Sequence, residues 1–470
     1  MLAASVKEKI IAVVTKENYD DSKTGRLVYS YDSTPNYQAL PDAVVSPRNT
    51  AEVSEIVSIC NEYHIPIVPR GSGTNLCGGT CPLEGGIVML FKYMNKILEI
   101  DEENLTATVQ PGVITFDVIT AVEEKGLFYP PDPGSMKIST IGGNINENSG
   151  GLRGLKYGVT RDYVMGLEIV LPNGEIIRTG GKLAKDVAGY DFTRLYVGSE
   201  GTLGIITEAT LKLIPIPEAK KTMLALYQDM EAAARSVSKI IANKIIPATL
   251  EFLDQPTLKV VEDYARIGLP TDVQAVLLIE QDGPPEVVER DIKKISDICT
   301  QEMAVSVQVA QSEAEAEALR TARRTALSAL ARLKPTTILE DATVPRSEIA
   351  KMVKAINEIA VKYNLDICTF GHAGDGNLHP TCPTDARNHE EMERVEKAFA
   401  EIFEKAIELG GTITGEHGVG VMKAPYLELK VGTAGIAAMQ SVKNALDPNN
   451  IMNPGKVFMD DSRKRVKIGQ

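Results

Sequence analysis

The chain has 470 residues, which is too many for one hydrophobic core, so we expect two or three domains. Its hydrophobic content of 43% and charged content of 24% are typical of a globular enzyme. The net charge of -13 argues against nucleic acid as the main partner, because no basic excess is available to neutralise phosphates.

Cysteine usage and hydropathy predict a soluble cytoplasmic protein. The six cysteines are scattered, and Cys77 and Cys81 lie four residues apart without a second pair at zinc-site spacing. We therefore expect reduced thiols. The N-terminus has a charged amphipathic pattern instead of a cleavable signal, and no apolar run approaches the roughly 18 residues that span a bilayer.

The N-terminal half begins with a helical segment over residues 1–36, followed by alternating strands and helices. Short apolar runs predict strands at 43–45 and 65–68, with a helix between them that Thr50 caps. The second strand leads into Pro69–Gly79, where four glycines and small hydroxyls expose backbone N–H groups to an anion. The loop is neither a P-loop nor a dinucleotide fingerprint, and a plain glycine-rich turn is the alternative.

Two further polar loops follow. Residues 130–151 are dense in Gly, Ser and Asn, and loops of this length without regular structure are usually functional. Residues 186–206 form another such segment, after a hairpin predicted over 167–177 on the turn Asn173-Gly174. Three polar glycine loops within about 140 residues predict a long ligand with a pyrophosphate.

The C-terminal half starts where prolines and charges interrupt the pattern at 214–221. Strands then alternate with helices, which predicts an antiparallel sheet with helices on one side, an α+β domain. A polar helix from Glu313 carries three arginines near its end. We expect Arg320 and Arg324 to be surface charges, as arginines on helices usually are.

Two stretches near the C-terminal end hold three of the five histidines. Asp375-Gly376 predicts a two-residue hairpin turn that places His372 opposite His379 on one face of a sheet, close enough to share a metal ion. Glu416 would be the third ligand, leaving one coordination position open, with His417 beside it as a base. For the histidine pair alone, a simple turn with two polar residues is an equal alternative.

The glycine loops also carry a family resemblance. Residues 69–79, the segments 141–144 and 148–151 with Tyr157-Gly158, and the segment 198–207 stand in the order of three flavin-binding motifs. The chain resembles the vanillyl-alcohol-oxidase-type flavoproteins over roughly residues 37 to 457. Within them it resembles the group of FAD-linked D-lactate dehydrogenases and flavin-binding chains of glycolate oxidase.

This resemblance implies an α+β fold with a two-part FAD-binding domain (VAO/PCMH-type) over 37–216 and an antiparallel-sheet α+β substrate and metal domain over 217–457. It implies FAD, held non-covalently because no histidine lies in 69–79. The cofactor-binding residues that it implies are Pro69, Arg70, Gly71, Ser72, Gly73, Thr74, Asn75, Gly78, Pro131, Asp132, Ser135, Thr140, Gly142, Gly143, Asn144, Asn148, Gly150, Gly151, Tyr157, Gly158, Glu200, Gly201, Ile205, Ile206 and Asn453.

The resemblance further implies oxidation of a D-2-hydroxy acid, with D-lactate to pyruvate as first choice and hydride transfer to flavin N5. Arg323 would bind the substrate carboxylate and His417 would take the hydroxyl proton. His372, His379 and Glu416 would hold zinc, iron(II) or manganese. No Lys or Arg lies in 335–345, which favours a monocarboxylate over a dicarboxylate substrate.

The reduced flavin needs an electron acceptor, and the sequence has no NAD fingerprint or iron–sulfur pattern. Among the relatives, a soluble partner of the electron-transferring flavoprotein type fits best. Three alternatives remain: a glycolate or other 2-hydroxy-acid oxidase using dioxygen, a non-catalytic flavin subunit of a larger complex, and a metal-free alcohol or phenol oxidase. A basic tail over 458–470 would be a solvated segment or a contact for an acidic partner.

Overall fold

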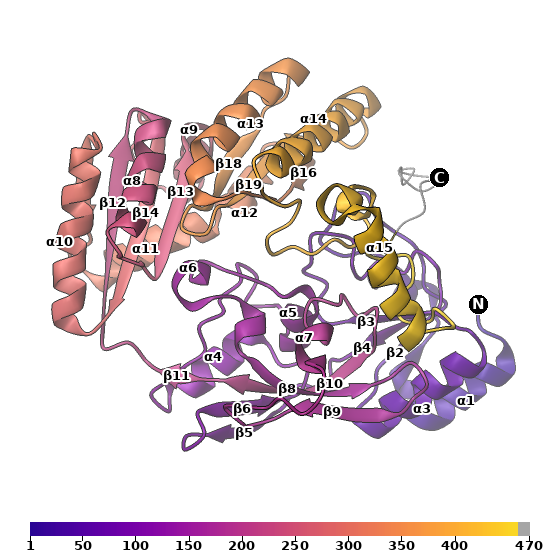
Figure 1. Ribbon diagram of the computed structural model, residues 1–470. Coiled ribbons are helices and arrows are strands. Elements are labelled where there is room, and N and C mark those ends of the chain that lie inside the picture. Colours follow the sequence, from indigo (N-terminus) through magenta and orange to yellow (C-terminus); the bar gives the residue numbers. More distant parts are fainter. Residues whose placement is uncertain (459–470) are drawn as a thin grey trace. The chain divides into compact units, whose positions relative to one another are not determined.

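The computed structural model describes residues 1–458 and divides the chain into two compact units (Figure 1). The first unit comprises Met1–Ser149, Val159–Ile216 and the chain from Glu416 on, and the second comprises Gly150–Gly158 and Pro217–Gly415. The predicted basic tail lies, apart from Phe458, outside the described residues. Residues 416–457, which we expected within the second domain, fold with the first unit.

The first unit contains two larger sheets and a small one. A four-stranded sheet has the order β1 (Tyr19–Asp20), β2 (Ala43–Val45), β4 (Ile87–Leu90), β3 (Ile67–Arg70), parallel except for β1. An antiparallel sheet has the order β5 (Ile97–Asp101), β6 (Thr106–Val109), β10 (Ile205–Lys212), β8 (Val164–Val170), β9 (Ile176–Gly180). The two-stranded sheet pairs β7 (Leu127–Phe128) with β11 (Ile214–Pro215). The hairpin predicted on Asn173-Gly174 is confirmed as β8–β9.

The helices of the first unit differ in how much apolar surface they bury, from five residues of α3 to none of α2. The helices are α1 (Ala4–Val14), α2 (Lys23–Val28), α3 (Thr50–Glu62), α4 (Thr115–Glu123), α5 (Ile141–Glu147), α7 (Phe192–Tyr196) and α15 (Leu427–Leu446). Asn49, not Thr50, caps α3 by accepting the Glu52 N–H. The apolar faces of α1 and α3 pack with β3 and β4 into one core.

The end of the described chain completes this core. Ile451 and Met452 are buried in it, and the Ile67 N–H donates to the Ile451 carbonyl over 2.7 Å. Residues 451–453 thereby run beside β3 like an additional strand. The Lys443 ammonium fixes this return, because it pairs with Asp447 and donates to the Met452 and Thr202 carbonyls, both at 2.8 Å. A buried ammonium requires such partners.

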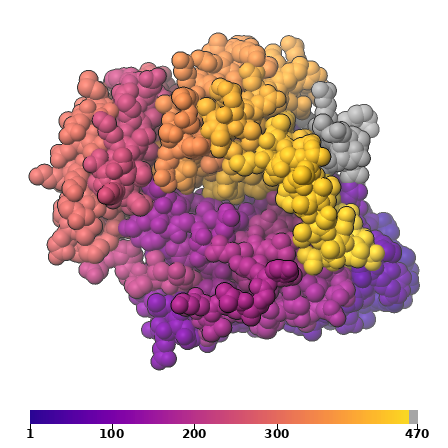
Figure 2. Space-filling model, viewed as in Figure 1, coloured from indigo at the N-terminus to yellow at the C-terminus, as the bar shows by residue number. Residues whose placement is uncertain are grey.

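The helix before this return, α15, is mostly at the surface, and it forms part of the yellow area in the space-filling view (Figure 2). Only Leu427 and Lys443 of its side chains are buried, and Gly432 interrupts it with a positive φ of 69°. In the part of the chain that the structure describes, no helix combines the length and apolar character that a bilayer crossing requires.

The second unit is built on one antiparallel sheet. Its order is β15 (Ser306–Val309), β12 (Ala219–Tyr227), β14 (Ala275–Gly283), β13 (Thr249–Asp254), β18 (Cys368–His372), β19 (Asn377–Thr384), β16 (Thr336–Leu339). The short strand β17 (Ala342–Thr343) also pairs with β19. The helices are α6 (Gly154–Tyr157), α8 (Met230–Ala242), α9 (Gln255–Ala265), α10 (Pro285–Gln301), α11 (Glu313–Arg324), α12 (Ala326–Leu330), α13 (Ile349–Tyr363) and α14 (His389–Glu408).

Helices cover both faces of this sheet, so the expectation of helices on one side is wrong. Tyr227 of β12 donates to Ser236 of α8, whereas Thr222 of the same strand accepts from Arg320 of α11. Residues 222 and 227 are an odd number of positions apart, and side chains of a strand alternate between the two faces. Helices α8 and α11 therefore lie on opposite faces.

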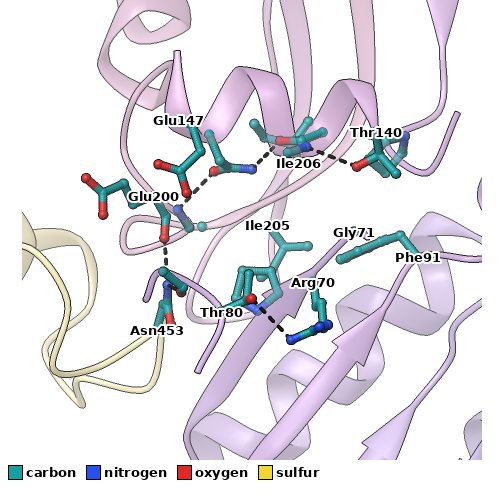
Figure 3. A pocket seen from close by; sticks show the side chains of 18 residues that line it. Arg70, Gly71, Thr80, Phe91, Thr140, Glu147, Glu200, Ile205, Ile206 and Asn453 are labelled. Atoms are coloured by element: carbon teal, nitrogen blue, oxygen red, sulfur yellow. Dashed lines mark hydrogen bonds between the residues drawn. The ribbon is translucent and has the colours of Figure 1, made fainter. Parts of the chain in front are cut away.

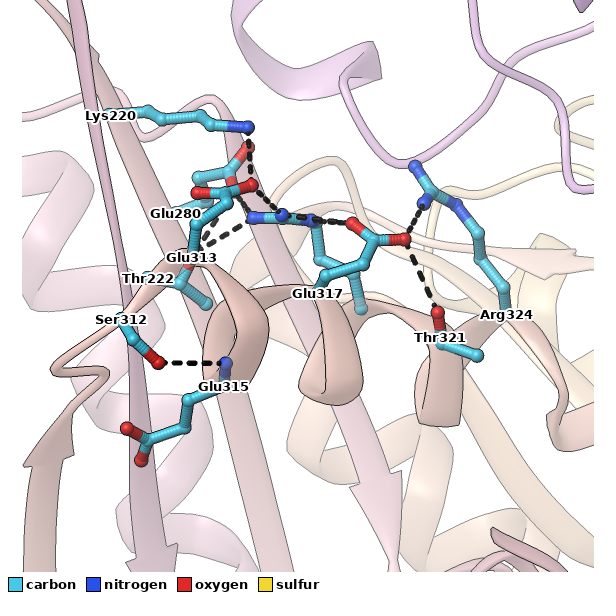
Figure 4. A network of polar contacts seen from close by, with 10 residues as sticks. Lys220, Thr222, Glu280, Ser312, Glu313, Glu315, Glu317, Thr321 and Arg324 are labelled. Atoms are coloured by element: carbon cyan, nitrogen blue, oxygen red, sulfur yellow. Dashed lines mark hydrogen bonds and ion pairs between the residues drawn. The ribbon is translucent and has the colours of Figure 1, made fainter. Parts of the chain in front are cut away.

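Arg320 is a buried member of an ion-pair network and not the surface charge that we expected (Figure 4). Its guanidinium donates to Glu280 at 2.6 Å, to Thr222 at 3.2 Å and to Glu313 at 2.5 Å. Alternation in the sequence could not predict this burial, because the partners Thr222 and Glu280 are far away along the chain. The network lies on the face of the sheet that also carries the two histidines described below.

Candidate functional site

The first unit contains a cleft of about 540 Å³ between its glycine-rich loops (Figure 3). The predicted residues that line it are Pro69, Arg70, Gly71, Thr140, Gly142, Gly143, Glu200, Gly201, Ile205, Ile206 and Asn453. The lining residues that the sequence reasoning missed are Gly79, Thr80, Phe91, Pro111, Asn146, Glu147 and Gly204. Because six of these residues are glycines and two are threonines, the cleft suits a long polar ligand that the chain approaches closely.

The loop after β3 offers hydrogen-bond donors. Within the described residues, the backbone N–H groups of residues 71–76 make no hydrogen bond. The guanidinium of Arg70, at the start of this loop, is 6% exposed and donates to the Tyr31 carbonyl at 2.7 Å and to Thr80 at 3.2 Å. Successive free N–H groups beside a buried cation form a site for an anion, and the pyrophosphate of FAD fits it.

Asn453 returns to the cleft through the strand-like segment 451–453. Its side-chain amide donates to the Gly79 carbonyl at 2.9 Å and to the Glu200 carbonyl at 2.7 Å (Figure 3). Its Oδ1 is buried without a hydrogen-bond partner among the described residues. A buried acceptor in this position is available to a ligand donor.

The carboxylate of Glu200 binds the backbone of the glycine-rich segment 418–420, which follows Glu416 and His417. Its two oxygens accept the N–H groups of Val419 and Gly420, each at 2.7 Å. A Cβ atom at Gly420, where φ is 51°, would lie 2.1 Å from the Cys77 carbonyl oxygen. Glycine is therefore required for this close approach, and the segment that follows Glu416 and His417 is fixed against the wall of the cleft.

The half-buried Glu147 lies close to the buried Glu200 at this end of the cleft. Its carboxyl oxygen Oε2 lies 3.7 Å from the Cys77 thiol, and no backbone N–H of the described residues donates to it. Burial and the negative charges of Glu200 and Asp32 raise the pKa of Glu147 well above its ordinary value, against smaller opposing effects of Cys77 and Lys423. Since Glu200 receives two N–H groups, we assign the charge to Glu200 and the proton to Glu147.

Replacing Glu147 by glutamine is expected to stabilise the protein more at pH 8 than at pH 5. The raised pKa means that the folded protein keeps a proton that the unfolded chain releases above about pH 4.5, so wild-type stability falls as the pH rises. This costs about 1.4 kcal/mol for each pH unit over which only the folded state holds the proton. Glutamine imitates the protonated carboxyl and removes the dependence. Thermal unfolding of both proteins from pH 5 to 8 measures it, and a constant difference would contradict the assignment.

The remaining predicted cofactor residues do not line this cleft. Those in the first unit are Ser72, Gly73, Thr74, Asn75, Gly78, Pro131, Asp132, Ser135, Asn144 and Asn148, and those in the second unit are Gly150, Gly151, Tyr157 and Gly158. Several support the local structure: Asn144 donates to Thr115 at 2.6 Å, and Asn148 ends α5 with a positive φ of 54°. The Tyr157 hydroxyl donates to Asp282 at 2.7 Å within the second unit.

In the second unit, the predicted histidine hairpin forms with a different register. His372 pairs with Asn377, and His379 pairs with Phe370, so the loop has four residues instead of two. The Gly374 N–H donates to the Leu250 carbonyl of β13, which takes this residue out of the hairpin ladder. The predicted direct opposition of His372 and His379 is therefore wrong. A shift of two residues keeps both on one face, and their ring centroids are 5.1 Å apart.

A buried carboxylate contacts the Nδ1 atom of each histidine. His372 Nδ1 lies 2.7 Å from Glu251, and His379 Nδ1 lies 3.1 Å from Asp341. Both carboxylates are 0% exposed. The contact of His372 with Glu251 has hydrogen-bond geometry, and a carboxylate that accepts the Nδ1 proton is the usual partner of a metal-binding histidine. This donor set fits a divalent metal ion.

The sequence reasoning missed both carboxylates. Glu251 interrupts the apolar run of β13, and Asp341 follows Ile338 and Leu339 of β16. A charged residue within a buried strand is costly unless it has a partner, and this was the available signal.

Arg323, at the end of α11, lies on the same face of the sheet. Its guanidinium is 6% exposed, pairs with Glu251 at 2.6 Å and stacks over the Phe370 ring at 4.9 Å. Its Nε atom is buried without a hydrogen-bond partner among the described residues. Unsatisfied guanidinium donors can bind a carboxylate, as the predicted role of Arg323 requires.

Glu416 and His417 belong to the first unit and follow directly on Gly415, the last residue of the second unit. The preceding residue, Gly415, donates its N–H to Asp341 at 3.0 Å, and Thr414 donates its hydroxyl to the same oxygen at 3.0 Å. Asp341 thus contacts both His379 and the residue to which Glu416 is covalently joined. The two predicted residues themselves lie 4.0 Å apart, measured from His417 Nε2 to Glu416 Oε1.

Comparisons with known proteins identify the family of the chain. The family of FAD linked oxidases, C-terminal domain, matches residues 216–457, and the FAD binding domain family matches residues 41–180. The chain is 76% identical over 466 residues to the glycolate oxidase subunit GlcD of Bacillus subtilis (strain 168), covering 99% of each chain. It is 38% identical to a D-lactate dehydrogenase of Anaerostipes hadrus, covering 91% of this chain and 92% of the relative.

Solved structures show the same fold at low sequence identity. The structure of p-cresol methylhydroxylase with substrate bound superimposes with a TM-score of 0.81 at 19% identity, covering 98% of this chain and 97% of the other. The predicted α+β fold of the vanillyl-alcohol-oxidase type is confirmed. With both family domains matched in order over most of its length, the chain belongs to the FAD-linked oxidoreductases.

Proposed function

We propose that the protein oxidises a short 2-hydroxy acid to the 2-oxo acid with FAD and one divalent metal ion. The observation that carries this proposal is the histidine pair of the second unit. Two imidazoles 5.1 Å apart, each with a buried carboxylate at Nδ1, share a sheet face with the buried guanidinium of Arg323. Metal-ligating imidazoles beside a carboxylate-binding arginine suit a substrate that bears a hydroxyl group next to a carboxylate.

Each residue has a defined task in this proposal. His372, His379 and Glu416 bind the metal, Arg323 holds the substrate carboxylate, and His417 takes the hydroxyl proton as general base. When bound, the metal polarises the hydroxyl group and the flavin accepts the hydride from C2. The residues around the cleft bind FAD non-covalently, since residues 69–79 contain no histidine that could be linked to it.

The charges around the histidines favour a small monocarboxylate. Glu340 and Asp341 are buried beside the hairpin, and residues 335–345 supply no Lys or Arg. A second substrate carboxylate here would meet like charges, and Arg346, which follows this stretch, already donates to the Gly374 carbonyl. Glycolate and D-lactate, which the names of the two relatives contain, both satisfy this condition. Because the relative that is 76% identical is named for glycolate, glycolate is the first substrate to test, with D-lactate beside it.

The electrons leave through a separate protein in this proposal. The name of the Bacillus subtilis relative contains the word subunit, which supports a partner chain that receives or relays them. A soluble electron-transferring flavoprotein is the type of partner that we propose. Stoichiometric hydrogen peroxide formed in air would instead identify dioxygen as the acceptor.

Anaerobic mixing of the holoenzyme with single hydroxy acids tests the function. We expect glycolate or D-lactate to bleach the visible absorbance of the oxidised flavin. L-lactate and D-2-hydroxyglutarate serve as the stereochemical and dicarboxylate comparisons and should react more slowly. A protein that stays yellow with all four acids would contradict the proposal and support a non-catalytic flavin subunit.

A further inference from the structure

Glu251 is a fully buried carboxylate in the middle of the central sheet of the second unit. It lies in β13 between Leu250 and Phe252, and its exposed fraction is 0%. An ionised carboxylate without partners would be strongly unfavourable in such a position. The two groups that face it should therefore explain why the chain keeps a charge here.

Each oxygen of Glu251 faces a different functional group. Oε1 lies 2.7 Å from His372 Nδ1, and Oε2 lies 2.6 Å from Arg323 Nη2. The first contact follows from strand pairing: Phe252 is opposite Gly371, so the antiparallel register places Glu251 opposite His372. The second contact comes from α11, which approaches the same face of the sheet.

We propose that Glu251 is a positioning residue that serves the metal site and the substrate site at once. One oxygen fixes the orientation of the His372 ring, while the other fixes Arg323 for the substrate carboxylate. This inference rests on the function proposed above. Glu251 itself touches neither the metal nor the substrate, and it couples the two sites through one rigid side chain.

The number of acceptors makes the role specific to a carboxylate. His372 must donate from Nδ1 if Nε2 is to bind a metal, and a guanidinium can only donate. Both contacts therefore need an acceptor, and a carboxylate supplies two. A glutamine of the same shape has one acceptor and one donor group. If the amide oxygen of the glutamine faces His372, its N–H₂ group faces the guanidinium of Arg323, and two donors then oppose each other. If the amide is turned over, its N–H₂ group donates to His372 Nδ1. The histidine proton is then on Nε2, the atom that should bind the metal.

The test compares Glu251→Gln with a matched control in the holoenzyme. Glu280→Gln removes the charge from another buried carboxylate that pairs with an arginine of α11, Arg320, in the adjacent strand β14 (Figure 4). It contacts none of the proposed site residues. Metal affinity is measured by titrating Zn²⁺ and Mn²⁺ into chelator-treated, FAD-loaded protein, and KM and kcat are measured with glycolate and D-lactate.

We expect Glu251→Gln to raise the metal Kd or the substrate KM by about 10-fold or more, as the loss of outer-shell partners of a metal site does. FAD content should stay unchanged, and Glu280→Gln should keep both constants near the wild-type values. Wild-type Kd and KM in Glu251→Gln, or equal losses in both variants, would overturn the inference.

A second variant guards against misfolding of the first. Glu251→Asp keeps the charge and both acceptors but is one methylene shorter, so it can reach only one of the two partners in good geometry. We expect the same selective loss, and wild-type Kd and KM in this variant would likewise overturn the inference. Failure of the proposed function would give a different result. The wild-type protein and His372→Ala would then bind the same amount of metal.

Discussion

Replacing His417 by alanine is expected to lower kcat by about 10²- to 10⁴-fold, the usual contribution of a positioned general base. The hydroxyl proton must leave as the C2 hydride departs, and imidazole is the side chain whose pKa normally lies near the working pH. His417 sits one residue before the segment 418–420 that Glu200 holds through two N–H groups, so its backbone is fixed independently of its own side chain. FAD content should therefore stay at the wild-type level.

Steady-state and single-turnover flavin reduction with glycolate and D-lactate measure this effect. His64→Asn is the control, because His64 is exposed and has a positive φ of 53°, which asparagine tolerates. We expect no change in this variant. A kcat in His417→Ala within a few-fold of wild type would remove His417 from the base role, whatever its FAD content.

The fold class was predictable from the sequence motifs, but the lining of the cleft only in part: eleven of the predicted cofactor residues line it and fourteen do not. Glycines and small polar residues concentrate where a loop approaches a ligand, and the loop after β3 indeed keeps the N–H groups of residues 71–76 free within the described chain. Local patterns did not predict that Glu147 lines the cleft. The raised pKa of Glu147 depends partly on Glu200, 53 positions later, whose carboxylate accepts the N–H groups of Val419 and Gly420.

The histidine hairpin shows what local rules can and cannot determine. The Asp-Gly turn signal predicted two strands and the correct shared face, because alternation depends only on whether a register shift is even or odd. The register itself was wrong by two residues. The contact that shifts it, from the Gly374 N–H to the Leu250 carbonyl, comes from a strand more than a hundred residues earlier. No local rule contains that contact.

The same limit applies to the carboxylates behind the histidines. Glu251 and His372 are separated by 121 positions, and they become neighbours only when β13 pairs with β18. Arg320 and Arg323 likewise look like exposed charges on a polar helix until α11 packs on the sheet. Residue chemistry thus singled out the candidate metal ligands, whereas the carboxylates behind the two histidines depend on tertiary structure.

Removing an imidazole from the hairpin is expected to have the second large effect. In His379→Ala, the metal would lose one of three protein ligands, and Asp341, 0% exposed, would lose its contact with the ring. We expect metal affinity to fall by more than about 100-fold, the upper end of the cost of losing an outer-shell partner, and turnover to be lost with it. FAD should stay bound, since the cleft in the first unit contains no residue of this hairpin.

Metal content after dialysis and flavin reduction by glycolate and D-lactate, measured on the same samples, test this expectation. His389→Ala replaces an exposed histidine of the same unit, at the start of α14, and should keep both metal and turnover. Chelation of the wild-type protein should reproduce the defect of His379→Ala, and added Zn²⁺ or Mn²⁺ should reverse it only in the wild type. If His379→Ala kept stoichiometric metal and full turnover, the hairpin would be a structural turn, and the oxidation would have to proceed without the cation that these histidines are proposed to hold.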